Sequence, residues 1–332
     1  MIILVTGASG FVGSLLVPRL LDAGHAVRAL GREPDRTLAV LEHYIDPDEV
    51  EVVRGDALMG EGLDRALAHV EVAYYLIHSM ESTDARAAAF SERDRIAAHN
   101  FAAAAARAGV RRIVYLGGLL PRGTPISQAR SSAPSSGQGP QAPPLSRHLA
   151  SRAEVERVLL AAVADSVALR ASIIIGARSR SFRLLVRLVE RMPVLTLPAW
   201  RRFRTQPIDQ RDAIAMLLAC ADAPVGGRSL EIGGPEVLTY EEILKRIAEL
   251  MLVRRPALGL AVNMTPIAAR VAAAIVSEDP NLVLPLMESL QGDLLPAEDD
   301  VAELLGVRLH SFDAAVERAL AEWEEYEPLA AR

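Results

Sequence analysis

Hydrophobic residues in the first half of the chain occur as short unbroken runs, separated by longer segments with a helical pattern. We predict strands over residues 2–5, 26–30, 50–53, 72–77, 112–116 and 167–175. We predict helices over residues 11–23, 85–108 and about 145–164. Strands that are wholly apolar and alternate with helices are typical of a parallel sheet covered on both faces. The fold class predicted for this half is therefore α/β.

The pattern changes after about residue 177. Short apolar pieces and proline-containing turns replace the alternation, and amphipathic helices are predicted over residues 240–250, 297–305 and 312–326. Segments near residues 206–208 and 228–232 are predicted to be strands that return to the sheet. We therefore expect residues 1–176 to form the main domain. Residues 177–332 are expected to form a smaller, mixed region that binds the substrate and partly returns to the sheet.

Residues 121–144 interrupt the regular alternation. The segment is rich in proline, serine, glycine and glutamine and has almost no large apolar residues, so it cannot bury enough surface to fold by itself. It lies between the fifth strand and the next helix, at the edge of the sheet where ligands bind in such folds. A mobile lid and a disordered insertion both explain this composition, and the insertion is the favoured interpretation.

A glycine-rich segment, TGASGFVG at residues 6–13, follows the first strand and begins the first helix. Gly7 allows a tight turn, Gly10 lets the backbone approach a pyrophosphate, and Gly13 lets the helix pack close to the sheet. The phosphates would face free N–H groups at the positive end of the helix dipole. The spacing is GxxGxxG instead of the commoner GxGxxG. Its place between strand and helix predicts a dinucleotide-binding Rossmann fold, with a doubly wound parallel sheet.

Composition narrows the class of protein. The 332 residues carry a formal net charge of −6 and only 4% aromatic residues, which argues against nucleic acid as a partner. The single cysteine, Cys220, excludes an intrachain disulfide and fits a reducing cytoplasm. The apolar start lacks the basic segment of a signal peptide, and the longest apolar stretch is too short for stable membrane insertion. No metal is expected, because no HExxH motif, CxxC motif or spaced acidic cluster is present.

With these elements placed, the chain resembles the extended short-chain dehydrogenase/reductase superfamily. The segment at residues 6–13 is similar to the cofactor fingerprint of the superfamily, and Gly55-Asp56 is similar to its acidic position near the adenine. Other segments resemble an atypical branch described as NAD(P)H-binding, or NmrA-like. They are AYYLIHSM at 73–80, IVYLGGL at 113–119, LRASIIIG at 169–176 and QPI at 206–208.

The resemblance implies that the cofactor lies along the carboxyl edge of the sheet. Asn100, in the long helix, corresponds to a polar position of the superfamily, and the backbone at the end of the fourth strand is expected to line the cofactor. The residues expected to bind the cofactor are Thr6, Gly7, Ser9, Gly10, Phe11, Val12, Gly13, Arg32, Asp56, Ala57, Tyr75, Ile77, His78, Ser79, Asn100, Leu116, Gly117 and Gly118.

Arg32 predicts which nicotinamide cofactor is used. It follows the second strand, where dinucleotide folds that select NAD usually carry an acid that accepts from the ribose hydroxyls. An arginine suits a 2′-phosphate, so NADP(H) is expected to be preferred over NAD(H). A simple loop charge is the alternative interpretation of this residue.

The segment that carries the Tyr-x-x-x-Lys of the superfamily departs from the pattern. It reads HLASRAEVE at 148–156, so His148 stands at the tyrosine position and Arg152 at the lysine position. Gly117 and Gly118 stand near the position of the usual serine, so the tyrosinate chemistry does not carry over. Because His148 and Arg152 share one helix face, the imidazole could transfer a proton while the guanidinium holds a ribose hydroxyl. The alternative interpretation is that both are ordinary residues on the surface of a helix and have no role in catalysis.

Together these residues predict an NADP(H)-dependent oxidoreductase that transfers hydride to a carbonyl, a quinone or an activated alkene. His148 and Arg152 would be its catalytic residues. The alternative is a non-enzymatic redox sensor or accessory protein that binds NADP(H) and acts through a protein partner. The missing tyrosine and lysine favour the alternative, whereas His148 argues against it. The expected partner of the enzyme is a small apolar molecule, the expected location is the cytoplasm, and a homodimer is left open.

Overall fold

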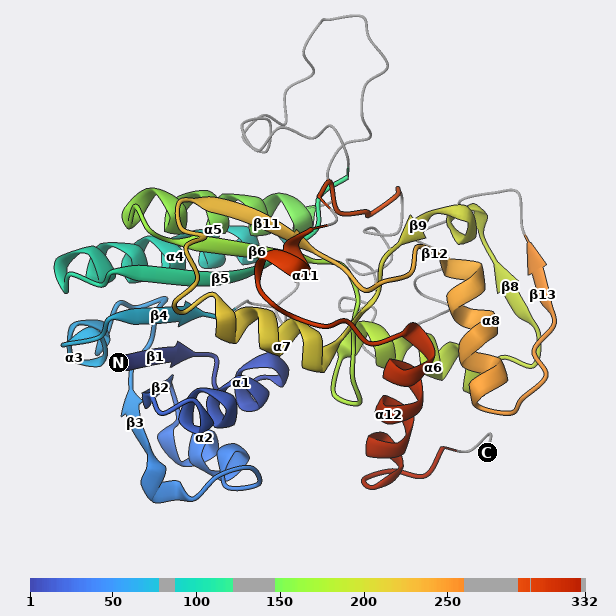
Figure 1. Ribbon diagram of the computed structural model, residues 1–332, viewed down its shortest axis with the longest axis horizontal. Coiled ribbons are helices and arrows are strands. Elements are labelled where there is room, and N and C mark those ends of the chain that lie inside the picture. Colours follow the sequence, from blue (N-terminus) through green and yellow to red (C-terminus); the bar gives the residue numbers. More distant parts are fainter. Residues whose placement is uncertain (78–86, 122–146, 260–291, 299, 330–332) are drawn as a thin grey trace, which may run out of the picture.

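The sheet at the centre of the molecule has seven parallel strands. In the computed structural model, which describes residues 1–77, 87–121, 147–259, 292–298 and 300–329, they follow the order β11-β6-β5-β4-β1-β2-β3 (Figure 1). Their bounds are β1 (Ile2–Thr6), β2 (Ala26–Gly31), β3 (Val50–Arg54), β4 (Val72–Tyr75), β5 (Arg112–Gly118), β6 (Val167–Ala171) and β11 (Arg228–Ile232). The strand order reverses between β1 and β4, and such a reversal opens a crevice for ligands at the carboxyl ends of the strands.

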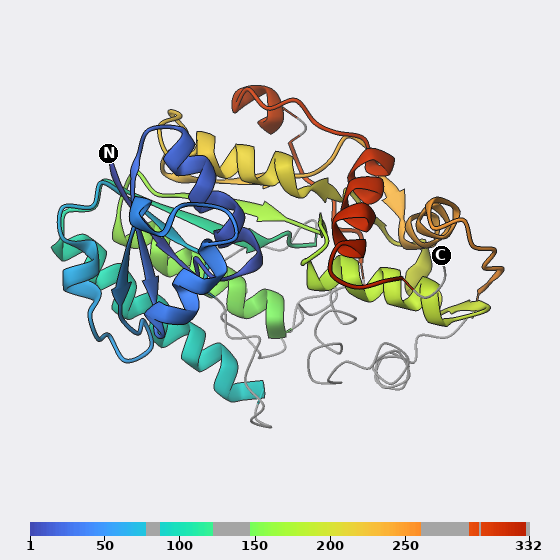
Figure 2. The same cartoon turned by 90° about the horizontal axis from the view of Figure 1, so that it is seen from below.

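Helices cover both faces of the sheet, which confirms the predicted doubly wound Rossmann fold (Figures 1 and 2). One face carries α3 (Leu63–Leu67), α4 (Ala87–Arg107) and α5 (Arg147–Ala162), and the other carries α1 (Phe11–Asp22), α2 (Pro34–Leu41) and α7 (Gln210–Ala219). Val72 and Tyr74 of β4 join the core under α1 and α7, whereas Ala73 and Tyr75 join the core under α4. Since successive side chains of a strand point to opposite faces, an unbroken apolar run becomes buried on both.

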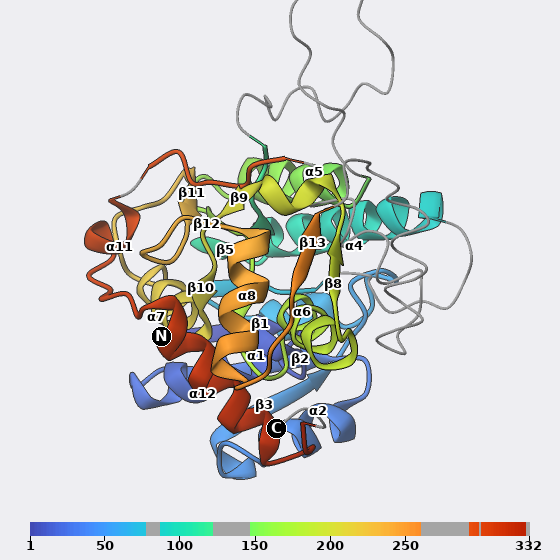
Figure 3. The ribbon, with the colours of Figure 1, turned by 90° about the vertical axis from the view of Figure 1, so that its right-hand side faces the viewer.

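The C-terminal part of the chain builds a third hydrophobic core beside the sheet (Figure 3). This core is surrounded by α6 (Arg180–Arg191), α8 (Tyr240–Leu250) and α12 (Phe312–Glu324), with the parallel pair β8 (Leu195–Leu197) and β13 (Ala257–Gly259). Tyr240 and Trp323 are buried in it. The smaller elements are η1 (Pro47–Glu49), β7 (Ile174–Ile175), η3 (Ala199–Arg202), β9 (Arg204–Thr205), β10 (Ile208–Asp209), β12 (Leu238–Thr239) and α11 (Val301–Leu304).

Several elements differ from the sequence-based prediction. The strand predicted over residues 167–175 ends at Ala171, and β7 pairs with β10 in a separate two-stranded sheet. The prediction that residues 206–208 return to the main sheet is therefore wrong, whereas residues 228–232 form β11 and pair with β6. Helices α6 and α7 were not predicted. In α6 the arginines hid the apolar pattern, because Arg183 and Arg187 lie over the ring of Trp323 instead of in solvent. The loop predicted over residues 121–144 lies outside the described residues apart from Pro121.

A buried ion cluster joins α5 to the last two strands of the sheet. Arg170 on β6 donates to Glu156 on α5 through Nε, at 2.9 Å from Oε2, and through Nη2, at 2.6 Å from Oε1. Nη1 of Arg170 lies 3.2 Å from Glu231 Oε1 on β11, and the Ser229 hydroxyl donates to Glu156. Arg170 and Glu156 are only 8% and 2% exposed, so solvent hardly screens the pair. Removing one member would leave the other charge buried and unpaired.

We expect Arg170→Met to lower the free energy of unfolding by about 3–5 kcal/mol, because the Glu156 carboxylate loses its partner inside the protein. Arg107→Met is the matched control, since the Arg107–Asp64 pair is 62% and 76% exposed. Its removal should change stability by no more than about 1 kcal/mol. Urea denaturation followed by circular dichroism measures both variants. Equal, small losses for the two would show that the cluster does not stabilise the sheet.

Candidate active site

The turn after β1 is tied to the end of β4. The Thr6 hydroxyl donates to the Tyr74 carbonyl at 2.9 Å and accepts from the Leu76 N–H at 3.1 Å. Gly7 has a φ of +68°, and a Cβ there would lie 2.8 Å from the Leu76 carbonyl oxygen. The side chain of Thr6 therefore holds the turn in place, and only glycine fits at position 7.

Helix α1 begins with N–H groups that no side chain satisfies. Gly10 is its N-cap, no side chain caps the helix, and its first turn contains no acid. A Cβ at Gly13 would lie 2.2 Å from the Gly7 carbonyl oxygen, so glycine at position 13 allows the helix to press against the turn. Gly10 is exposed, and a Cβ there would meet only the same oxygen, at 3.1 Å. The half-buried residues around this space are Ser9, Phe11 and Val12. These features fit a bound pyrophosphate.

Two exposed arginines follow β2. Arg32 comes directly after Gly31, the last residue of the strand, and no ion pair or hydrogen bond of its side chain is found within the described part of the chain. Arg36, in the first turn of α2, is also exposed. Arg36 is not among the expected cofactor residues, because the sequence pattern predicts no helix over residues 34–41. Both cations are available to a phosphate at this edge of the sheet.

Arg28, by contrast, is committed to the fold. Its Nε donates to Glu51 at 2.7 Å, and its Nη1 donates to the carbonyls of Ala66 and Ala68 at 2.8 and 2.9 Å. The guanidinium is thus fixed between β3 and α3. Arg28 adds nothing to the charge offered to a ligand.

The loop after β3 is shaped by two of the predicted cofactor residues. Asp56 Oδ1 accepts hydrogen bonds from the N–H groups of Leu58 and Met59, at 2.7 and 3.3 Å. Asn100 on α4 donates from Nδ2 to the carbonyls of Ala57 and Leu58, at 3.0 and 2.9 Å. These side chains therefore set the backbone of the loop, which is the part that would face an adenine.

The end of β4 offers backbone to the site instead of side chains. Tyr75 is 1% exposed, and its ring lies edge-to-face on Phe101 with 5.0 Å between the ring centres. Burial raises the pKa of the Tyr75 phenol, which lies in the core. Ile77 is half-buried, and His78 and Ser79 lie outside the described residues. The Tyr75 side chain is therefore not placed to donate a proton to a substrate.

Arg152 on α5 lies against the carboxyl end of β5. Its Nη2 donates to the Leu116 carbonyl at 2.8 Å, and its Cζ lies 5.6 Å from the centre of the Tyr115 ring. Burial raises the pKa of Tyr115 to about 12, although the Arg152 charge acts in the opposite direction. Arg152 Nε is buried and has no hydrogen-bond partner within the described residues. A buried donor without a partner is costly, so this nitrogen marks a place for an acceptor from a ligand.

Close packing surrounds Arg152. A Cβ at Gly117 would lie 3.0 Å from the Tyr115 ring, and a Cβ at Gly118 would lie 3.1 Å from Leu149. Gly117 therefore leaves room for the Tyr115 ring, and Gly118 lets α5 approach β5. His148 belongs to the first turn of α5, one helical turn before Arg152. Its role stays a prediction.

Comparison with known proteins identifies the nucleotide-binding half. Residues 7–134 match the family described as NAD(P)H-binding. Ceramide reductase of Caulobacter vibrioides is 29% identical over 265 residues, which cover 78% of this chain and 75% of that protein. A (4-alkanoyl-5-oxo-2,5-dihydrofuran-3-yl)methyl phosphate reductase of Streptomyces griseus is 40% identical over 114 residues, 34% of this chain and 33% of that protein. Dihydroflavonol 4-reductase of Dianthus caryophyllus is 57% identical over 42 residues, 13% of this chain and 11% of that protein. The matches to the Streptomyces griseus and Dianthus caryophyllus reductases thus span well under two thirds of the length of those proteins.

Solved structures show the same fold over the whole chain. UDP-glucose 4-epimerase of Thermotoga maritima has a TM-score of 0.69 at 14% identity, covering 98% of this chain and 99% of that one. UDP-glucuronic acid 4-epimerase of Bacillus cereus, in complex with NAD, has a TM-score of 0.69 at 16% identity, covering 98% and 97%. The likeness to these structures shows the shared fold, and residues 7–134 carry an NAD(P)H-binding domain; both agree with the resemblance to the extended short-chain dehydrogenases/reductases. The place of the chain in the NmrA-like branch stays a prediction.

A search of the described residues for membrane-spanning helices finds none of sufficient length and hydrophobicity. The three relatives described above are named reductases, and others are named dehydrogenases, which agrees with the expected class of NAD(P)H-dependent oxidoreductase.

Changing Gly10 or Gly13 to alanine should have different effects, one on NADPH affinity and the other on stability. Gly10→Ala places a methyl group in the space before α1, so we expect NADPH to bind at least about tenfold more weakly with stability within about 0.5 kcal/mol of wild type. Gly13→Ala forces the helix away from the turn, so we expect a loss of stability of about 1–3 kcal/mol. Fluorescence titration with NADPH and urea denaturation separate the two effects. Normal NADPH affinity in Gly10→Ala would mean that the pyrophosphate lies elsewhere.

Proposed function

We propose that this protein is an NADP(H)-dependent oxidoreductase that transfers hydride between the cofactor and a carbonyl, quinone or activated alkene. The observation that carries the proposal is the uncapped start of α1, with the exposed Gly10 before it, at the crevice where the strand order reverses. The NAD(P)H-binding family match supports the same use of this crevice. A nicotinamide cofactor, when bound, supplies the hydride chemistry.

Each end of the cofactor has a proposed partner in the chain. The N–H groups at the start of α1 hold the pyrophosphate, and Arg32, with Arg36 beside it in sequence, holds the 2′-phosphate of NADP(H). The unpaired Nε of Arg152 donates to a ribose hydroxyl. His148, one turn earlier on the same helix, protonates the oxygen of a carbonyl substrate as negative charge develops on it. The pair replaces the tyrosine and lysine that relatives of this class use.

A small apolar substrate belongs to the same proposal. The match to ceramide reductase extends over most of the chain and supports the apolar character of the substrate, although not its small size. The C-terminal region supplies the walls of the substrate site, and the protein acts in the cytoplasm. Because the fold serves many reactions, the test of this proposal is turnover with a panel of ketones, enals and quinones.

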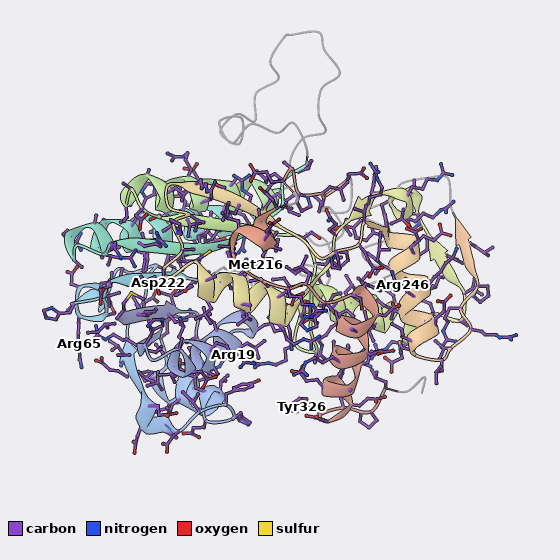
Figure 4. All side chains as sticks on the ribbon, viewed as in Figure 1. Arg19, Arg65, Met216, Asp222, Arg246 and Tyr326 are labelled. Carbon is purple, nitrogen blue, oxygen red and sulfur yellow. The ribbon has the colours of Figure 1, made fainter. Side chains whose placement is uncertain are left out.

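Arg32→Ala should remove the preference for NADPH. In the wild type, NADPH should bind about ten- to a hundredfold more tightly than NADH, because a charge-assisted contact to the 2′-phosphate adds about 1.5–3 kcal/mol. The variant should bind both cofactors with similar affinity and leave the NADH affinity unchanged. Arg65→Ala removes one exposed positive charge from α3 (Figure 4) as the matched control and should keep the preference. Isothermal titration measures all affinities, and equal binding of both cofactors by the wild type would contradict the assignment.

His148→Ala should lower carbonyl reduction by at least about a hundredfold while NADPH affinity stays close to wild type, because a general acid contributes about 10²–10⁴-fold. His148→Gln should not restore activity, since an amide has no proton to give. Steady-state kinetics with NADPH measure the effect.

The control for this substitution is His99→Ala, which removes an exposed histidine from α4 and should leave turnover unchanged. Full activity in His148→Ala would show that this residue is not the acid. Tight NADPH binding without turnover on any acceptor would contradict the enzymatic proposal itself.

A further inference from the structure

A cavity of about 270 Å³ lies between the end of α2, the start of α6 and the end of α12. The cavity therefore lies between the nucleotide-binding half and the C-terminal part of the chain. Its lining includes His43 and Tyr44 after α2, Arg178 and Arg183 around the start of α6, and Glu327 after α12. None of these residues is among those named individually as binding the cofactor or taking part in the proposed reaction.

Arg178 brings a positive charge to this cavity that no carboxylate balances. Its Nη1 donates to the hydroxyl oxygens of Ser14 and Tyr44, at 3.0 and 3.1 Å. The side chain is half-buried, and it forms no ion pair within the part of the chain that the structure describes. Arg170 and Arg211, which are also shielded from solvent, each pair with a carboxylate at 2.6 Å. The two hydroxyls fix the Arg178 guanidinium in place but leave its charge unneutralised.

The carboxylate in the cavity wall is already engaged. Glu327 Oε2 accepts from Trp323 Nε1 at 3.2 Å, and its Oε1 accepts from Arg187. The hydrogen bond from Trp323 holds the pKa of Glu327 below its usual value, and Arg187 acts in the same direction. Arg183 lies 3.7 Å from Glu327 and 4.6 Å from the centre of the Trp323 ring. Arg187 also pairs with Glu190, so two carboxylates serve Arg183 and Arg187, and the positive charge of Arg178 is the one left over.

Aromatic and aliphatic groups form the rest of the wall. Trp323, Tyr44 and Val40 lie along it, and Tyr326, 69% exposed, stands at the end of α12 near the rim (Figure 4). Such a wall suits a flat apolar body, while the guanidinium of Arg178 suits an oxyanion. The volume is close to that of small-molecule sites at the lower end of their usual range.

We propose that this cavity is a second ligand site, which binds a small organic oxyanion carried on an aromatic or other flat apolar body. Arg178 and Arg183 bind the phosphate or carboxylate, and the rings of Tyr44 and Tyr326 flank the body. The ligand touches α2 on one side and α6 and α12 on the other, so its binding links the nucleotide-binding half to the C-terminal part. This site is independent of the proposed reaction.

Phenyl phosphate is the probe, with benzoate and inorganic phosphate as comparisons, titrated calorimetrically with and without saturating NADPH. We expect saturable binding of phenyl phosphate that is unaffected by NADPH and tighter than that of inorganic phosphate. Arg178→Gln should weaken it about ten- to a hundredfold, the size of one lost charge-assisted contact. Arg19→Gln, the matched loss of an exposed arginine on α1 (Figure 4), should bind as wild type. NADPH affinity should be the same in all three proteins, which also shows that the variants are folded.

Three results would overturn the proposal. They are the absence of saturable binding by phenyl phosphate and benzoate, competition between phenyl phosphate and NADPH, and an unchanged affinity in Arg178→Gln. Equal affinity for phenyl phosphate and inorganic phosphate would contradict the role given to the aromatic wall. Because the calorimetric signal does not require turnover, loss of the proposed enzymatic function would leave this test intact.

Discussion

The contact between the Gly7 carbonyl and Gly13 determines where helix α1 starts, and the candidate site depends on that position. No side chain fits at residue 13, because its Cβ would lie 2.2 Å from the carbonyl oxygen. The helix is therefore pressed against the turn, and Thr6 ties the same turn to β4. As a result the free N–H groups of α1 face the crevice between β1 and β4. The other candidate residues come from neighbouring strand ends along this edge, so the sheet order brings them together.

The helix that carries His148 and Arg152 depends on distant parts of the chain. Glu156 lies one turn after Arg152 and pairs with Arg170 on β6, which in turn contacts Glu231 on β11. Arg152 itself reaches the Leu116 carbonyl on β5. The position of this helix is thus fixed from three strands at once. A proton donor that must lie within hydrogen-bond distance of a substrate benefits from such a rigid support.

The sequence predicted the nucleotide-binding half well, because its signals are local. Unbroken apolar runs identify buried parallel strands, and glycines at residues 7, 10 and 13 mark the turn before α1. The sequence could not show that Asn100 shapes the loop after β3, since its partners are backbone groups more than forty residues away in the chain. It also missed α6, where arginines packed over Trp323 resemble exposed charges. Pairing of β7 with β10 depends on contacts across the molecule, which no local pattern records.

The late return of the chain to the sheet has a consequence for its synthesis. Helix α7 and strand β11 lie beyond residue 209. Yet α7 covers Tyr74, and the Leu217 carbonyl of this helix accepts a hydrogen bond from the Tyr74 hydroxyl at 2.9 Å. A nascent chain that ends near residue 176 has made the glycine-rich turn but lacks the cover for one face of the sheet and the neighbour of β6. Its open strand edge and uncovered apolar face are features that favour aggregation. The stretch that matches the NAD(P)H-binding family is therefore not a unit that can be excised from the rest of this protein.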